Sequence, residues 1–133
     1  MKLTSRCEYA MLALIYLGRQ KAGTLLSVDA IARTQNIPPK FLEQIMLTLK
    51  RAKYVRSAKG RKGGYQLAKP MERISLAEIV RLFDGALAPS ESVSEHFYEP
   101  TPLEKEAKLV HVFRDIRDYA SKKLEATTIG DML

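Results

Sequence analysis

Cysteine and histidine are nearly absent from the chain, which has 133 residues but only Cys7, His96 and His111. A single thiol excludes an internal disulfide, a CxxC pair and a thiolate cage around a metal ion. Cys7 falls in a predicted apolar helix, which favours a buried core position over a redox thiol. Two isolated histidines favour surface or packing roles over a metal site. We therefore predict no bound metal and no cofactor.

Long hydrophobic runs are also missing, because the longest, Ala10–Leu17, is far shorter than a bilayer span. It is followed at once by polar residues and by no small-residue cleavage site, which argues against a signal peptide. We expect a cytoplasmic protein that associates with the nucleoid and not with a membrane.

Catalytic motifs are absent as well. The sequence holds no nucleophile–base pair, no HExxH-like spacing and no phosphate loop. Its glycine-rich stretch, residues 59–64, joins two predicted strands instead of opening a helix. These absences exclude an enzyme.

Acidic residues are scarce in one quarter of the chain. The formal net charge is +7 overall, yet residues 40–73 hold ten Lys or Arg and only Glu43 and Glu72, a net charge of +8. The remainder is close to neutral. Such a concentration favours a polyanionic partner over a merely solvated basic surface.

Helix starts are the clearest local signals in the sequence. Ser5–Glu8, Ser75–Glu78 and Thr101–Glu104 each have the spacing of a capping box. Together with apolar periodicity they predict helices over residues 5–19, 27–35, 39–52, 75–83 and 102–126, and strands over 54–58 and 65–68. We divide the chain into a unit at 1–85, a mobile loop at 86–101, a helix at 102–126 and a C-terminal tail at 127–133.

This order of elements is typical of a mainly α, winged helix-turn-helix fold with a small two-stranded wing. The 39–52 helix fits the major groove, and Lys40, Glu43 and Gln44 supply the donors and acceptors that base edges require. Arg61 and Lys62, at the tip of the wing, suit the electronegative minor groove of double-stranded DNA. A plain tight turn would explain the wing glycines alone. The predicted DNA contacts are Lys40, Glu43, Gln44, Lys50, Arg56, Lys59, Arg61, Lys62, Gly63 and Tyr65.

The last predicted helix carries an apolar stripe too long for one small domain to cover, which marks an interface. We predict a homodimer that is built on this helix and reads a pseudo-palindromic site. The predicted dimer contacts are Leu109, Val112, Phe113, Ile116, Tyr119, Ala120 and Leu124.

Several runs resemble the IscR/NsrR/CymR family of bacterial winged-helix regulators, also called the Rrf-two family. They are the start at residues 1–5, Glu8-Tyr9-Ala10, residues 41–44, residues 55–57 and residues 63–67. The resemblance implies that the third helix and the wing read DNA and that the long helix crosses between protomers. It also implies backbone anchors at Lys59, Lys62 and the start of the first helix.

The 86–101 loop departs from the resemblance. Cluster-binding members carry three cysteines there, whereas this loop has none, and Ser92 and Thr101 stand near two of those positions. Hydroxyls are poor iron ligands beside thiolates. Glu8 lies near a carboxylate ligand of some relatives, but its capping role explains it without metal. We therefore expect an unknown effector and no self-held iron–sulfur cluster.

One alternative of a different class stays open. The chain could be an adaptor whose 86–124 loop and helix bind a partner protein, with DNA binding secondary. The basic wing argues against it, and salt-dependent duplex binding would separate the two functions. In either case the 86–101 loop is a candidate site for an effector or partner protein.

Overall fold

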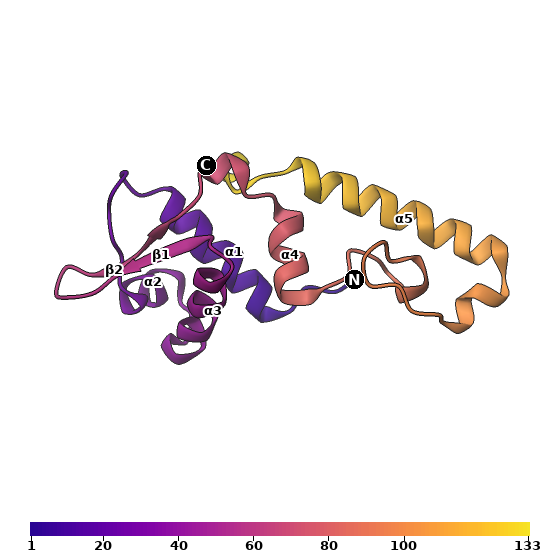
Figure 1. The fold of residues 1–133 in the computed structure, drawn as a ribbon, viewed down its shortest axis with the longest axis horizontal. Coiled ribbons are helices and arrows are strands. Elements are labelled where there is room, and N and C mark those ends of the chain that lie inside the picture. Colours follow the sequence, from indigo (N-terminus) through magenta and orange to yellow (C-terminus); the bar gives the residue numbers. More distant parts are fainter.

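The computed structural model describes residues 1–133 and has a helical unit with a small hairpin, from which one long helix extends (Figure 1). The helices are α1 (Ser5–Gly18), α2 (Val28–Gln35), α3 (Pro39–Arg51), α4 (Leu76–Asp84) and α5 (Ala107–Ala126). Strands β1 (Val55–Ala58) and β2 (Gly64–Leu67) form the antiparallel wing. Four short 3-10 turns complete the order: η1 (Met71–Arg73), η2 (Glu91–Val93), η3 (Pro102–Lys105) and η4 (Ile129–Met132). The predicted mainly α winged-helix fold is confirmed.

The core lies between α1, the inner face of α3 and α4. Leu14 of α1, Ile45 of α3 and Ile79 of α4 are completely buried within one hydrophobic cluster. Each such side chain contributes about 1.5–3 kcal/mol on burial. The rings of Tyr9 in α1 and Phe41 in α3 pack edge to face, with their centroids 5.7 Å apart, and connect the two helices. This packing holds α3 with its opposite face exposed.

Three of the predicted helix starts, those of α2, α3 and α4, are confirmed. The Ser27 hydroxyl accepts a hydrogen bond from the Ala30 amide at 3.1 Å and caps α2. At α4 the capping box is complete, since the Glu78 amide donates to the Ser75 hydroxyl and the Glu78 carboxylate accepts from the Ser75 amide. Pro39 stands in the first turn of α3, as predicted.

The predicted capping box at Ser5–Glu8 is wrong. The cap is Thr4, whose hydroxyl accepts from the Cys7 amide at 3.3 Å, and Ser5 is the first helical residue. The reason is a distant carboxylate: Asp84, at the end of α4, accepts from the Thr4 amide at 3.0 Å and from its hydroxyl. Thr4 is therefore held as the cap by tertiary contacts.

The predicted helix start at Thr101–Glu104 is also wrong. Thr101 caps nothing, because its hydroxyl donates to Ser92 at 2.9 Å. Residues 102–105 form only the turn η3, and α5 begins at Ala107. The long helix thus starts five residues later than the predicted 102 and ends at 126 as predicted.

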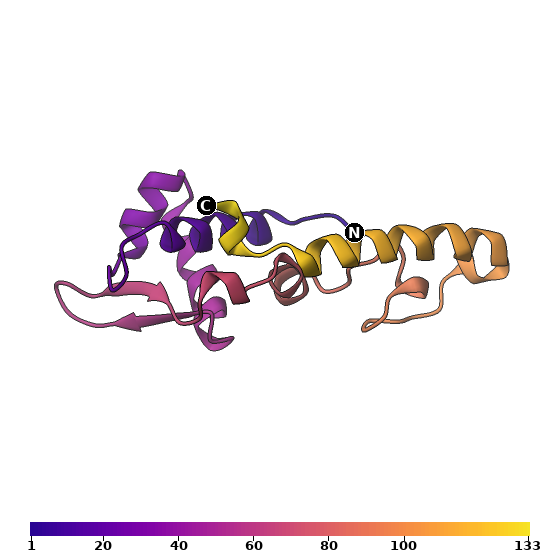
Figure 2. The ribbon, with the colours of Figure 1, turned by 90° about the horizontal axis from the view of Figure 1, so that it is seen from above.

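The segment at 86–101 leads away from the end of α4 and lies alongside α5 (Figure 1). It was predicted as a mobile loop but contains ordered, buried residues. Ser92, Val93 and Ser94 are buried around the turn η2. Arg117 of α5 joins the two by donating to the Val93 carbonyl at 3.0 Å. The loop and the long helix therefore pack as one arm, which Figure 2 shows extending away from the hairpin.

The C-terminal segment, residues 127–133, returns to the helical unit. The Leu76 amide donates to the Thr127 carbonyl and the Ile129 amide to the Ile74 carbonyl, each at 2.8 Å. The Ile129 side chain is completely buried in the main core. Arg19 donates to the Met132 carbonyl at 3.1 Å. Residues predicted as a tail thus complete the core of the first 85 residues.

Candidate nucleic-acid interface

The outer face of α3 is the first part of the candidate interface. Lys40, Glu43 and Gln44 are all exposed, and their i, i+3, i+4 spacing sets them on one side of the helix. Leu42 and Ile45 point the other way into the core. The predicted major-groove residues are therefore brought together on the free side of the helix.

The turn before α3 sets its angle to α2. Asn36 ends α2 in the left-handed conformation, with φ of 54°, and the Ile37 amide donates to the Ala32 carbonyl at 2.9 Å. Asparagine adopts this conformation more readily than most residues. Ile37 is buried, so the turn is anchored by its own side chain. The N-terminal end of α3 is left exposed at Pro38 and Pro39.

The wing depends on two adjacent glycines. A Cβ on Gly63 would collide with the carbonyl oxygens of Ala58 and Gly60, across the turn. Gly64 has a φ of +147°, and a Cβ there would lie 2.5 Å from the backbone of Leu26. Both positions therefore require glycine for the fold of the turn itself. Lys59, Arg61 and Lys62 are exposed at its tip.

Tyr65 differs from the other predicted DNA contacts. Its side chain is half-buried and packs against the main core, and its backbone exchanges hydrogen bonds with Leu26 at 2.7 and 3.0 Å. This bridge fastens the wing to the segment before α2. Tyr65 thus has a packing role that the sequence did not indicate.

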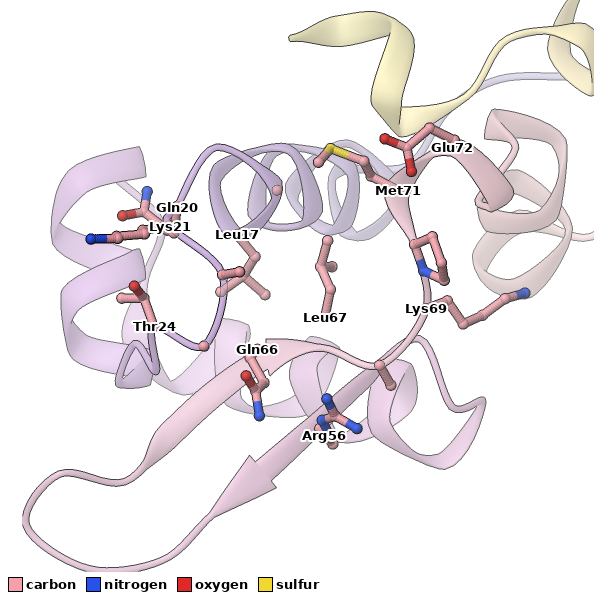
Figure 3. Close-up of a pocket in the computed structure, with 15 residues that line it drawn as sticks. Leu17, Gln20, Lys21, Thr24, Arg56, Gln66, Leu67, Lys69, Met71 and Glu72 are labelled. Carbon is pink, nitrogen blue, oxygen red and sulfur yellow. The ribbon is translucent and has the colours of Figure 1, made fainter.

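Lys50 and Arg56 lie at the base of the hairpin, apart from the tip. They line a shallow hollow of about 630 Å³ with Lys53 and Lys69, and none of its lining residues is acidic. Arg56 also borders an open cavity of about 490 Å³ between the hairpin and the end of α1. Figure 3 shows Arg56 beside Gln66, its cross-strand partner, with Lys21 across the cavity. Basic side chains thus occupy both ends of the wing.

A polar junction connects the wing to α4. The Tyr54 hydroxyl and the Lys69 ammonium both donate to Glu78, at 3.1 and 3.3 Å, and the ammonium also lies 4.9 Å from the Tyr54 ring centroid. Burial raises the pKa of Glu78, but the hydrogen bonds from Ser75, Tyr54 and Lys69 outweigh it and lower that pKa overall. Burial, followed by the charge and hydrogen bond of Glu78, raises the pKa of Tyr54 to about 12.

The loop hydroxyls form a compact cluster. The Ser90 hydroxyl lies 3.0 Å from that of Ser92 and 3.3 Å from that of Thr101, and Ser92 and Thr101 are hydrogen-bonded to each other. The three hydroxyl groups hydrogen-bond to one another, and the cluster contains no thiolate that could bind iron. No three His, Cys, Asp or Glu side chains of the chain are grouped to hold a metal ion. The donors present do not fit an iron–sulfur centre.

Cys7 and Glu8 do not supply the missing ligands. Burial, with the nearby Asp84, raises the pKa of the Cys7 thiol to about 12, so it stays protonated at neutral pH. The thiol lies in the main core, among the residues of α1. Glu8 is exposed on the same helix and neither caps it nor meets a second donor in a metal-binding group.

The predicted dimer stripe on α5 divides into two sets. Leu109, Val112, Ile116 and Tyr119 are exposed, with Tyr119 75% accessible. Phe113, Ala120 and Leu124 are half-buried, and Leu124 packs against the main core. The first set is free for an intermolecular contact, whereas the second also serves the protomer's own packing. No helix in the chain has the length and apolar character needed to cross a membrane.

The fold and its basic face define a winged helix-turn-helix transcription regulator that binds DNA. Residues 3–133 match the Rrf2 family, described as "Iron-dependent Transcriptional regulator", and the chain belongs to this family. The chain is 36% identical over 135 residues to Rv1287 of Mycobacterium tuberculosis, named an HTH-type transcriptional regulator, covering 99% of this chain and 81% of that protein. These names are those of transcription regulators and not of enzymes.

Solved structures agree with this assignment. The structure of CymR, "the Global Cysteine Regulator of B. subtilis", is 27% identical with a TM-score of 0.80, covering 99% of this chain and 95% of that chain. The oxidised form of Staphylococcus aureus CymR is 32% identical with a TM-score of 0.76 and the same coverage. The predicted resemblance to the family is therefore confirmed.

Proposed function

We propose that the chain acts as a homodimer that reads a pseudo-palindromic duplex, with α3 in the major groove and the basic wing in the minor groove. One observation supports this proposal most directly. Lys40, Glu43 and Gln44 are exposed on one face of α3, and the only charged side chains at the tip of the wing are basic. A glutamate accepts from a cytosine amine, a glutamine pairs with adenine, and lysine reaches guanine or phosphate. Arg61 and Lys62 meet the narrow, electronegative minor groove.

The exposed residues of α5 support the homodimer. Leu109, Val112, Ile116 and Tyr119 follow one another at spacings of three, four and three residues, which is the pattern of a helix–helix seam. A second copy of the same helix offers the matching apolar surface through a two-fold axis. We call residues 1–85 of each protomer the DNA-reading unit. Two such units joined through α5 require a site with two-fold symmetry.

Fluorescence anisotropy with labelled duplexes at several salt concentrations tests DNA reading. Lys62→Ala should weaken all duplexes alike and reduce the salt slope by about one, because one phosphate contact is lost. Glu43→Ala should instead relax preference at one base pair, by about 1–3 kcal/mol. Lys108→Ala, which removes an exposed cation from α5, is the matched control. Affinity that ignores both salt and Arg61→Ala would contradict DNA reading and favour the adaptor function.

We also propose that the effector is not a self-held iron–sulfur cluster and that it acts at the 86–101 loop. The hydroxyl cluster of Ser90, Ser92 and Thr101 supports the first part, since it offers no thiolate. Exposed Phe97 and Tyr98 support the second, because aromatic side chains free of the core suit a partner protein or small ligand. Anaerobic purification followed by iron and sulfide assays should find neither in stoichiometric amount. A brown protein that bleaches in air would contradict this proposal.

A further inference from the structure

Leu47 interrupts the polar outer face of α3. It follows Lys40, Glu43 and Gln44 at the i+7 position from Lys40, so it lies on the same side of the helix, about 10 Å further along the axis. Its side chain is 36% exposed, whereas Ile45, Met46 and Leu49 are completely buried. Between Leu12 and Phe97 it is the only large hydrophobic side chain that is exposed.

The surroundings of Leu47 do not form an apolar docking surface. The residues three and four positions away along the helix are Glu43, Gln44, Lys50 and Arg51, all exposed and polar. The Thr48 hydroxyl donates to the Gln44 carbonyl at 3.1 Å, so it is engaged by its own helix. A single apolar side chain within a polar, basic stripe suits a partner that is itself mostly polar and anionic but carries an isolated methyl group.

We propose that Leu47 contacts the 5-methyl group of one thymine in the major groove of each half-site. This inference rests on the proposed placement of α3 in that groove. Thymine is the only base whose major-groove edge carries a methyl group, and apolar side chains read it by contact. Leu47 lies three residues beyond Gln44, about 4.5 Å along the helix axis, which is about one base-pair step when the helix lies along the groove. Leu47 would therefore specify a base pair next to those read by Glu43 and Gln44.

Uracil substitution tests the contact, because uracil lacks only this methyl group. Bound duplexes are first selected from a random-sequence library, and each thymine of a selected site is then replaced singly by uracil. One thymine per half-site should respond, with affinity of the parent protein falling about fourfold for the loss of one buried methyl. Leu47→Ala should bind the thymine duplex more weakly and should bind thymine and uracil duplexes equally. That non-additivity identifies a direct contact.

The control variant is Leu12→Ala, which removes another exposed leucine, 42% accessible, from α1. It should keep the full thymine-to-uracil ratio even if its overall affinity changes. A uracil penalty that survives Leu47→Ala, or selected sites in which no thymine responds, would overturn the thymine contact alone. Failure to select any duplex would contradict the proposed DNA reading and, with it, this inference.

Discussion

Replacing Ile129 by alanine tests whether the C-terminal segment is an integral part of the DNA-reading unit. Ile129 is completely buried against residues that lie more than 50 positions earlier, and its amide donates to the Ile74 carbonyl. The variant loses three buried carbon atoms and leaves a cavity, which costs about 3 kcal/mol in the free energy of unfolding.

This loss of unfolding free energy predicts a fall in the melting temperature. A chain of this length has an unfolding entropy of about 0.28 kcal/mol/K, so the midpoint should fall by about 11 °C. Thermal unfolding followed by circular dichroism measures it, at one fixed protein concentration because dimerisation would shift the midpoint. A single cooperative transition is expected for both proteins, since the segment belongs to the main core.

Met132→Ala is the matched control in the same segment. Met132 is 36% exposed and its contact with Arg19 uses only the backbone carbonyl, so its loss should cost less than about 0.5 kcal/mol. Equal midpoints for Ile129→Ala and the parent protein, or equal shifts in the two variants, would refute the packing of the segment into the core.

Three further outcomes follow from the contacts described above. Ile116→Asp should convert the homodimer to a monomer in light scattering, because it would bury an unpaired charge between the two α5 helices. Lys122→Asp is the control and should leave the dimer intact. A parent protein that is already monomeric would contradict the dimer. Glu78→Gln should cost about 1–3 kcal/mol in urea unfolding at pH 7. Because the folded state lowers the pKa of Glu78, this cost should shrink as pH falls below about 4.3, and a cost independent of pH would disprove the role of the charge. Cys7, with its pKa of about 12, should react with a disulfide reagent only after denaturation; rapid reaction in the folded protein would contradict its burial.

The elements that could be predicted from the sequence are those defined by neighbouring residues. Pro39 marks the first turn of α3, and Ser75 and Glu78 complete a capping box within four residues. Gly63 and Gly64 mark the wing turn because the backbone approaches too closely for any side chain. For Pro39, Ser75 and Gly63 the determining contact lies within a few residues of the position itself. Gly64, in contrast, approaches the backbone of the distant Leu26.

The predictions that were wrong depended on distant residues. Thr4 replaces Ser5 as the cap of α1 because Asp84, eighty residues later, holds it. Thr101 fails to cap because Ser92 takes its hydroxyl. Ile129 lies after the predicted long helix, in a seven-residue segment that is too short for an apolar period to signal burial. Leu47 could have been found from the helical spacing of the α3 face, but only after Ile45, Met46 and Leu49 were known to fill the core.

The return of the C-terminal segment has a consequence for biosynthesis. The core that residues 1–85 form is complete only when Ile129 has also left the ribosome. The whole of α5, with its exposed apolar side chains, is therefore translated before that core is complete. An incomplete nascent chain thus exposes two apolar surfaces at the same time: the part of the core that Ile129 later covers, and the exposed side of α5.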